Sequence, residues 1–430
     1  MNLRIVIIGY GPGGVAAATA ARSFDRDAKI TILTGETIDA HKKPGASMAF
    51  EFPNTNALSI NEWSFDSLSK KRIQVVAGVR VVSGSLKRHS LAVLDEHGNS
   101  SDVEFDKLVI ATGGIPALPN IPGIHLDGVY TIKDMTDTSR IGMNLNRLHR
   151  FVVVGAGFSG LEAAERLLSL EKEVHMVIRS RLMRRQLEDE MSRELQSRLP
   201  SRLVLHEGAS PKIVLGDATV TGIELSNDEV LETDAVLFMT GVRPSTEVAK
   251  SLNIAIGELG GIKVDENMET SIPGVYAVGD CTEMIDSLTG KSILMPIGSV
   301  AARAGRQAGV AAVGGKKVYD DTSLLFQYDR IFGIDIVCVG HSSSSAKTLG
   351  QGTQVTYLED SAEFSKVALV TDNSGRLIGG QVIASRLGAR IGYQILERIE
   401  SGAILEERPL LEPQHKRMKE LLEQTLGPIQ

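Results

Sequence analysis

Two stretches of the chain show the same order of apolar and small residues. Residues 3–8 are largely apolar and lead into residues 9–14, with the sequence GYGPGG, before an alanine-rich segment. Residues 151–154 are apolar and lead into residues 155–160, with the sequence GAGFSG. Apolar runs that do not alternate with polar residues are typical of parallel strands covered on both faces. Each stretch therefore predicts a buried strand, a glycine turn and a helix.

The glycine spacing in both turns is that of a dinucleotide-binding motif. The first glycine allows a tight turn, the second lets the backbone approach a pyrophosphate, and the third lets the helix pack on the strand. The helix N-terminus then offers free N–H groups to the phosphates. One match is weak evidence in a chain with 43 glycines, but two in the same context indicate two dinucleotide sites. The glycines expected to bind cofactor are Gly9, Gly11 and Gly14 in the first turn and Gly155, Gly157 and Gly160 in the second.

Length and composition narrow the class of protein. A chain of 430 residues is expected to form two or three domains. Its net charge of -7 argues against nucleic acid as a partner, and no apolar run reaches the roughly 18 residues of a membrane span. Two distant cysteines and a first strand that starts near Leu3 favour the cytoplasm. The scattered histidines give no support for a metal site.

Three further segments carry a family resemblance. Residues 105–114 are a predicted strand that ends in Ala-Thr-Gly, residues 240–244 read TGVRP, and residues 270–280 are a predicted strand that ends in Gly-Asp. With the two glycine turns, they resemble the pyridine nucleotide–disulfide oxidoreductase superfamily along nearly the whole chain. The resemblance implies an α/β fold with two Rossmann-like dinucleotide-binding domains, one for FAD and one for NAD(P), plus a C-terminal α+β dimerisation domain.

The domain boundaries and the FAD site follow from this resemblance. It implies an FAD domain from residues 1–112 and 265–316, an inserted NAD(P) domain from 113–264, and a C-terminal domain from 317–430 that makes a homodimer the default. Glu36, after the second strand, is the candidate for the FAD ribose. Further residues implied in cofactor binding are Val81, Ala111, Thr112, Gly113, Gly241, Gly279, Asp280, Ile297 and Ala301.

Arginines follow the second strand of the NAD(P) domain. That predicted strand, residues 173–178, ends without the acidic residue that would bind an adenosine ribose. Arg179 and Arg185 stand at a spacing similar to that of NADPH-using glutathione reductases, and guanidinium groups bind phosphate with two hydrogen bonds. NADPH is therefore the expected coenzyme. NADH remains an alternative, because the arginines could form a solvated face. In addition, many NADPH enzymes carry an alanine at the third glycine of the motif, which is Gly160 here.

The cysteine chemistry of the superfamily is missing. Its classical members use a Cys pair, and some relatives a single Cys, where this chain has residues 40–48, AHKKPGASM. Thiol–disulfide exchange needs a thiolate, so disulfide and peroxide reduction by those routes are disfavoured. Cys281 and Cys338 lie elsewhere, and both are expected to be structural.

The segment around residue 43 is more similar to rubredoxin, ferredoxin and nitrite reductase flavoproteins. In those relatives a basic residue and a proline contact the flavin, which gives Lys43 and Pro44 that role here. Glu162 matches a glutamate placed near flavin N5, although Met48 stands where its lysine partner is expected. Glu162 and Lys43 are the candidate catalytic residues. His415 is interpreted as a surface residue, with a place over the partner's flavin as the alternative.

The function expected from these features is an FAD-dependent NAD(P)H oxidoreductase. Hydride passes from NAD(P)H to flavin, and electrons then go to an acceptor without a cysteine relay, as in ferredoxin or rubredoxin reductases. The sequence leaves the acceptor open between a small redox protein, a quinone and O2. The alternatives are an NAD(P)H oxidase that reduces O2, or a regulatory flavoprotein with slow turnover.

Overall fold

The computed structural model describes residues 2–39, 46–51, 60–132, 135–319, 323–360, 364–405 and 418–426. They form two compact units, described separately below. The first unit contains residues 1–44, 56–117 and 242–324, and the second contains residues 45–55, 118–241 and 325–430. The predicted three-domain division stays a prediction.

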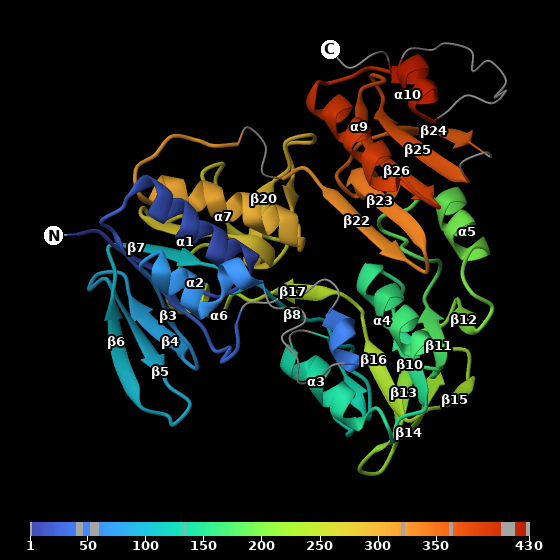
Figure 1. The fold of residues 1–430 in the computed structure, drawn as a ribbon, viewed down its shortest axis with the longest axis horizontal. Coiled ribbons are helices and arrows are strands. Elements are labelled where there is room, and N and C mark those ends of the chain that lie inside the picture. Colours follow the sequence, from blue (N-terminus) through green and yellow to red (C-terminus); the bar gives the residue numbers. More distant parts are fainter. Residues whose placement is uncertain are drawn as a thin grey trace. The chain divides into compact units, whose positions relative to one another are not determined.

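The first unit is built on a parallel sheet of five strands in the order β19-β7-β1-β2-β3 (Figure 1). The strands are β1 (Arg4–Ile8), β2 (Lys29–Leu33), β3 (Ile73–Val76), β7 (Lys107–Ile110) and β19 (Val275–Ala277). Helices α1 (Pro12–Phe24) and α7 (Gly298–Ala312) pack tightly together. A Cβ on Gly305 or Gly309 of α7 would come within 2.2 Å of the carbonyl oxygen of Gly13 or Ala17 in α1. The small residues of both helices therefore allow this close packing.

Smaller elements complete the first unit. An antiparallel sheet consists of β4 (Arg80–Ser85), β5 (Ser90–Leu94) and β6 (Ser100–Glu104). The short strands are β8 (Gly114–Pro116), β17 (Val242–Pro244), β18 (Ile262–Lys263), β20 (Thr282–Ile285) and β21 (Ser292–Ile293). The short helices are η2 (Asn61–Trp63), α2 (Phe65–Lys70), α6 (Glu247–Ser251) and η3 (Gly279–Cys281).

The second unit repeats the parallel arrangement. Its sheet has the order β12-β11-β10-β16-β9. The strands are β9 (Val129–Tyr130), β10 (Arg150–Val154), β11 (Glu173–Ile178), β12 (Leu203–Glu207) and β16 (Ala235–Phe238). The helices around it are η1 (Ala46–Phe50), α3 (Met135–Asn144), α4 (Phe158–Ser169) and α5 (Asp189–Ser197). An antiparallel sheet of β13 (Pro211–Gly216), β14 (Val220–Leu225) and β15 (Val230–Glu232) shares its hydrophobic core.

The C-terminal part of the second unit is an antiparallel sheet with helices. Its strands are β22 (Phe326–Ile331), β23 (Ile334–Gly340), β24 (Thr353–Asp360), β25 (Ser365–Asp372) and β26 (Leu377–Ala384). The helices are α8 (Ser343–Thr348), α9 (Gly388–Glu400) and α10 (Met418–Leu426). The apolar runs at 366–370 and 377–383, on either side of the Asp-Asn-Ser-Gly segment at 372–375, predict a hairpin, and the antiparallel β25–β26 pair forms it.

The predicted fold class is confirmed, because each glycine turn joins a buried parallel strand to a helix. Within the described ranges, no helix is long and apolar enough to cross a membrane.

Candidate functional site

The glycine turn after β1 leaves one of its glycines facing open space. Gly9 has a φ of 118°, and a Cβ there would lie 2.1 Å from the carbonyl oxygen of Ala111. A Cβ on Gly14 would lie 2.1 Å from the carbonyl oxygen of Gly9. By contrast, a Cβ on Gly11 would have no atom of a described residue within 4 Å. Gly9 and Gly14 thus serve the packing of the chain, whereas Gly11 borders a cradle that a ligand can enter.

The turn after β10 has the same geometry. Gly155 has a φ of 107°, and its Cβ would lie 2.5 Å from the carbonyl oxygen of Met239. A Cβ on Gly160 would lie 2.0 Å from the carbonyl oxygen of Gly155, while a Cβ on Gly157 would meet nothing within 4 Å. The structure therefore contains two equivalent cradles, each fit for a dinucleotide pyrophosphate.

The helices after both turns present uncapped N-termini. Gly11 and Gly157 are the N-cap residues of α1 and α4, no side chain caps either helix, and no acidic residue lies in either first turn. Free N–H groups and the positive end of the helix dipole attract phosphate at such a position. Among the described residues, no side-chain cap or first-turn carboxylate would compete with an anion bound at these helix ends.

Other predicted FAD residues meet at the carboxyl edge of the first sheet. The Ala111 N–H donates to the Ile8 carbonyl at 2.8 Å, and the Thr112 hydroxyl donates to the Ser245 carbonyl at 2.7 Å. Gly279 has a φ of 79°, and its Cβ would lie 3.3 Å from the Cβ of Ala301. In parallel sheets ligands bind beyond the carboxyl ends of the strands, so this edge is where FAD is expected.

The remaining first-unit candidates lie around the same edge or near it. Asp280 and Glu36 are half-buried and follow β19 and β2, and Ile297 is the N-cap of α7. Gly113 accepts a backbone hydrogen bond from Ser245. Val81 lies on β4, where it is buried and paired with Val93.

Five candidates remain. Lys43, Pro44 and His415 lie outside the described residues. Glu162 is half-buried in the second turn of α4. Gly241 is exposed after β16 and has a φ of 98°.

Four arginines follow β11, and the two predicted ones, Arg179 and Arg185, differ from Arg181 in their contacts. Arg181 donates to the carbonyls of Arg184 and Leu187 at 2.8 and 3.0 Å. Arg179 and Arg185 are exposed, and their side chains make no hydrogen bond or ion pair with any described residue. Burial and the neighbouring arginines lower the pKa of Arg184. Arg181 also pairs with Asp189, whereas the charges of Arg179 and Arg185 are not neutralised by the described residues.

Both cysteines are buried free thiols. The Cys281 thiol donates to the carbonyl of Val278 at 3.3 Å, and Cys338 lies on β23. Burial raises the pKa of both thiols. Neither side chain is therefore disposed to form a reactive thiolate.

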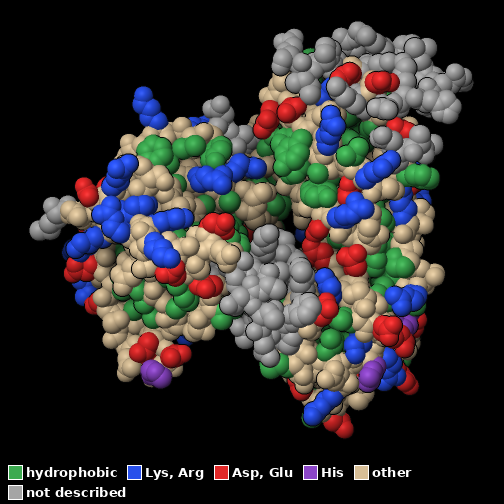
Figure 2. Space-filling view, viewed as in Figure 1, with side chains coloured by type: hydrophobic (Ala, Val, Ile, Leu, Met, Phe, Trp, Pro, Cys, Tyr) green, Lys and Arg blue, Asp and Glu red, His purple; other side chains and the backbone are tan. Residues whose placement is uncertain are grey.

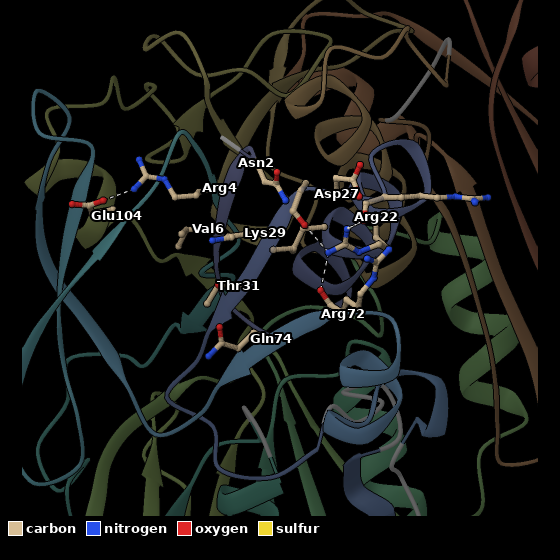
Figure 3. Close-up of a pocket in the computed structure, with 13 residues that line it drawn as sticks. Asn2, Arg4, Val6, Arg22, Asp27, Lys29, Thr31, Arg72, Gln74 and Glu104 are labelled. Atoms are coloured by element: carbon tan, nitrogen blue, oxygen red, sulfur yellow. Dashed lines mark hydrogen bonds and ion pairs between the residues drawn. The ribbon is translucent and has the colours of Figure 1, made fainter.

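A separate cavity of about 400 Å³ lies at the amino ends of β1, β2 and β3 (Figure 3). Lys and Arg side chains gather over the neighbouring face, which carries α1 (Figure 2). Arg4 pairs with Glu104 and Asp106. Arg22 donates to the carbonyls of residues 25, 26, 28, 71 and 72. Arg4 and Arg22 are thus engaged in contacts within the protein. The cavity lies at the edge of the sheet opposite the glycine turn.

A chain of polar contacts that the sequence did not predict joins β11 to β12 and the residues after them. The His175 Nδ1 and His206 Nε2 atoms are 2.8 Å apart, and each histidine contacts a glutamate, Glu173 or Glu229, at 3.0 Å. The pairing depends on the β11–β12 register, which nothing in the sequence pattern specifies.

Comparisons with known proteins agree with this geometry. The family model described as pyridine nucleotide-disulphide oxidoreductase matches residues 3–311. An NADH oxidase from Methanocaldococcus jannaschii is 28% identical, over 94% of this chain and 90% of that protein. An NAD(P)H coenzyme A polysulfide/persulfide reductase from Pyrococcus horikoshii is 25% identical, over 94% of this chain and 91% of that protein.

Solved structures with the same fold include three of different activity. An NAD-dependent persulfide reductase from A. fulgidus has a TM-score of 0.87 and 26% identity, with 96% of this chain and 80% of that one covered. A ferredoxin reductase from Rhodopseudomonas palustris has a TM-score of 0.79 and 24% identity, with 89% and 91% covered. An engineered water-forming NADPH oxidase bound to NADPH has a TM-score of 0.84 and 21% identity, with 97% and 96% covered.

The family model covers well over half of the chain, and the two glycine cradles have the geometry that two dinucleotides require. The chain belongs to the pyridine nucleotide-disulphide oxidoreductase family, and it is an FAD-dependent NAD(P)H oxidoreductase.

Proposed function

We propose that this oxidoreductase takes hydride from NADPH and passes electrons from FAD to a small redox protein without a cysteine relay. The observation that carries the proposal is the state of the thiols. The chain has two cysteines, both are buried, and burial raises the pKa of each. A relay would need an accessible thiolate beside the flavin.

The first unit supplies the residues for FAD. Gly11 and the N-terminus of α1 would bind the pyrophosphate, and Asp280 would hydrogen-bond the cofactor at the end of β19. Glu36 would bind the ribose, and Lys43 with Pro44 would contact the flavin. When bound, FAD supplies a ring that accepts hydride at N5 and releases electrons one or two at a time.

The second unit supplies the residues for NADPH. Gly157 and the N-terminus of α4 would bind its pyrophosphate, and Glu162 would orient the nicotinamide. Arg179 and Arg185 would bind the 2′-phosphate. The substitutions that make the engineered oxidase use NADPH introduce an arginine, then a serine, then a second arginine, at the spacing of Arg179, Ser180 and Arg185 here. The same set removes the aspartate directly before the first introduced arginine, and the residue directly before Arg179 here is Ile178.

Direct reduction of O2 is the second candidate. It is favoured by the NADH oxidase relative, which aligns with 94% of this chain. The ferredoxin reductase fold neighbour is consistent with a protein acceptor.

A homodimer is also part of the proposal, and light scattering should then give twice the 46.2 kDa chain mass.

The test is anaerobic stopped-flow reduction of the FAD-loaded enzyme with NADPH and NADH in parallel. We expect faster bleaching of the flavin with NADPH at equal concentration. Reduced enzyme is then mixed with air-saturated buffer, or anaerobically with an oxidised ferredoxin or rubredoxin. Fast reoxidation by the protein and slow reoxidation by air supports the proposal. Rapid stoichiometric O2 consumption would instead establish the oxidase, and flavin that neither coenzyme reduces would refute both.

A further inference from the structure

The loop that carries the accessible arginines, residues 179–188, is tied to the glycine turn of the second unit. The Met183 N–H donates to the carbonyl of Ala156, between the two glycines of the turn, at 2.9 Å. Met183 holds a φ of 46°, in the left-handed region, and its side chain is buried. The position of the loop is therefore fixed relative to the NADPH pyrophosphate cradle.

The other end of the loop is anchored to the C-terminal part of the same unit. Glu188 is 7% exposed, and its carboxylate accepts hydrogen bonds from the Ser343 N–H at 2.7 Å and from the Ser343 hydroxyl. It also accepts from the Gln381 amide at 3.1 Å. In return, the Glu188 N–H donates to the Gln381 side-chain oxygen at 2.7 Å. A buried carboxylate with this many donors is held in one position.

A separate hydrogen bond reaches Arg185 itself. The Ser342 hydroxyl donates to the Arg185 carbonyl at 2.7 Å, and the same oxygen accepts from the Ser345 N–H at the start of α8. Figure 1 shows α5, which follows the loop, beside β25 and β26. The loop is thus bonded to the glycine turn at Met183 and to residues 342–381 at Arg185 and Glu188.

These contacts fix the backbone at Arg185, and Arg179 directly follows β11, while no described residue neutralises either side chain. Preorganised cations bind an anion more tightly than mobile ones, because less conformational entropy is lost on binding. Nothing in the contacts of Glu188 reaches the pyrophosphate cradle directly, so the anchor should affect the 2′-phosphate more than the rest of the coenzyme.

We infer that Glu188 and Ser342 are positioning residues that set the preference for NADPH over NADH, so that the C-terminal part of the second unit determines coenzyme specificity. The inference depends on the proposed binding of the 2′-phosphate by Arg179 and Arg185.

The test compares Glu188→Ala and Ser342→Ala in the FAD-loaded enzyme, with calorimetric titration of 2′,5′-ADP and 5′-AMP. We expect the affinity for 2′,5′-ADP to fall by about tenfold in Glu188→Ala and less in Ser342→Ala, with 5′-AMP affinity unchanged within about twofold. Glu188→Gln keeps an acceptor for Ser343 and should restore part of the loss.

The matched control is Glu190→Ala. Glu190 bridges α5 to Lys366 of the C-terminal sheet at 2.6 Å but does not bond the loop, so its removal should leave both affinities unchanged. Equal weakening of both nucleotides in Glu188→Ala and Ser342→Ala, or no weakening, would overturn the inference. Arg185→Ala distinguishes failure of the proposed phosphate site from failure of this inference. If Arg185→Ala leaves the affinity for 2′,5′-ADP unchanged, the proposed 2′-phosphate site is wrong. If Arg185→Ala selectively lowers that affinity and Glu188→Ala does not, only the positioning role of Glu188 is wrong.

Discussion

Arg179 and Arg185 are the residues on which coenzyme choice is expected to depend. Their exposed side chains have no partner among the described residues, and a guanidinium–phosphate hydrogen bond contributes about 1.5–3 kcal/mol. The double change Arg179→Ala with Arg185→Ala should raise the KM for NADPH about 100-fold and that for NADH by less than about twofold. Arg193→Ala, an exposed arginine of α5, is the control. Steady-state kinetics that show equal losses for both coenzymes would contradict the assignment.

Gly11 and Gly9 differ in what a methyl group would meet, and the difference predicts two distinct defects. Alanine at position 11 would point into open space, so the apoprotein should keep its melting temperature but retain less FAD on purification. Alanine at position 9 would meet the Ala111 carbonyl at 2.1 Å with a φ of 118°, which should destabilise the apoprotein by about 1–3 kcal/mol. Flavin absorbance measures the FAD content, and thermal melting measures the stability of the apoprotein. Normal FAD content in Gly11→Ala would remove this glycine from the site.

The two buried cysteines should be unreactive in the native protein. Because burial raises both pKa values, little thiolate forms even at pH 8.5, where an ordinary cysteine is about half ionised. Alkylation followed by mass spectrometry should therefore label neither thiol in native enzyme at this pH and both in guanidinium. Cys281→Ser should keep turnover within about threefold, since a hydroxyl can donate to the same carbonyls. Loss of turnover with FAD still bound would give Cys281 a chemical role.

At the scale of elements, the duplication predicted from the glycine turns extends to an ion-pair clamp. Arg4 opens β1 and pairs with Asp106, which precedes β7. Arg150 opens β10 and pairs with Asp234, which precedes β16. Each aspartate also accepts from the backbone N–H of its arginine. The same contact thus closes the amino edge of both parallel sheets.

The Arg4 clamp predicts a pH dependence of stability. Hydrogen bonds from the Arg4 side chain and backbone lower the pKa of Asp106 to about 2, below the roughly 3.9 of an unfolded aspartate. A depressed folded pKa stabilises the protein above the unfolded pKa, and this stabilisation is lost as the pH falls toward 2. Asp106→Asn should therefore lower the urea midpoint at pH 6 and lower it less at pH 3. Because the pair is over one-third exposed, the difference should be small. An equal deficit at both pH values would mean that the asparagine disturbs packing instead.

How far the sequence could predict each element depended on the range of the interactions involved. The strand, turn and helix at residues 4–24 follow from local apolar runs and glycine spacing, and so does the 365–384 hairpin. The antiparallel sheets at 80–104 and 211–232 were not predicted, since their short strands alternate weakly, and the second sheet gains stability from packing on the core of its unit. Glu188 was not predicted either. Its partners Ser343 and Gln381 are 155 and 193 residues away in the sequence, and no local sequence pattern predicts such a contact.

At the scale of the whole molecule, the two cradles lie in different compact units, so two ligands should stabilise the protein independently. A ligand that binds only the folded state adds about 2.7 kcal/mol at 100 times its Kd. FAD and NADP+ should therefore each raise the melting temperature of the apoprotein, and each effect should be removed by a different substitution. Gly11→Ala should abolish the shift caused by FAD, and Gly157→Ala the shift caused by NADP+. The crossed combinations are the controls: FAD added to Gly157→Ala and NADP+ added to Gly11→Ala should act as in the unaltered chain. If either substitution removed both shifts, the two turns would not be serving separate dinucleotides.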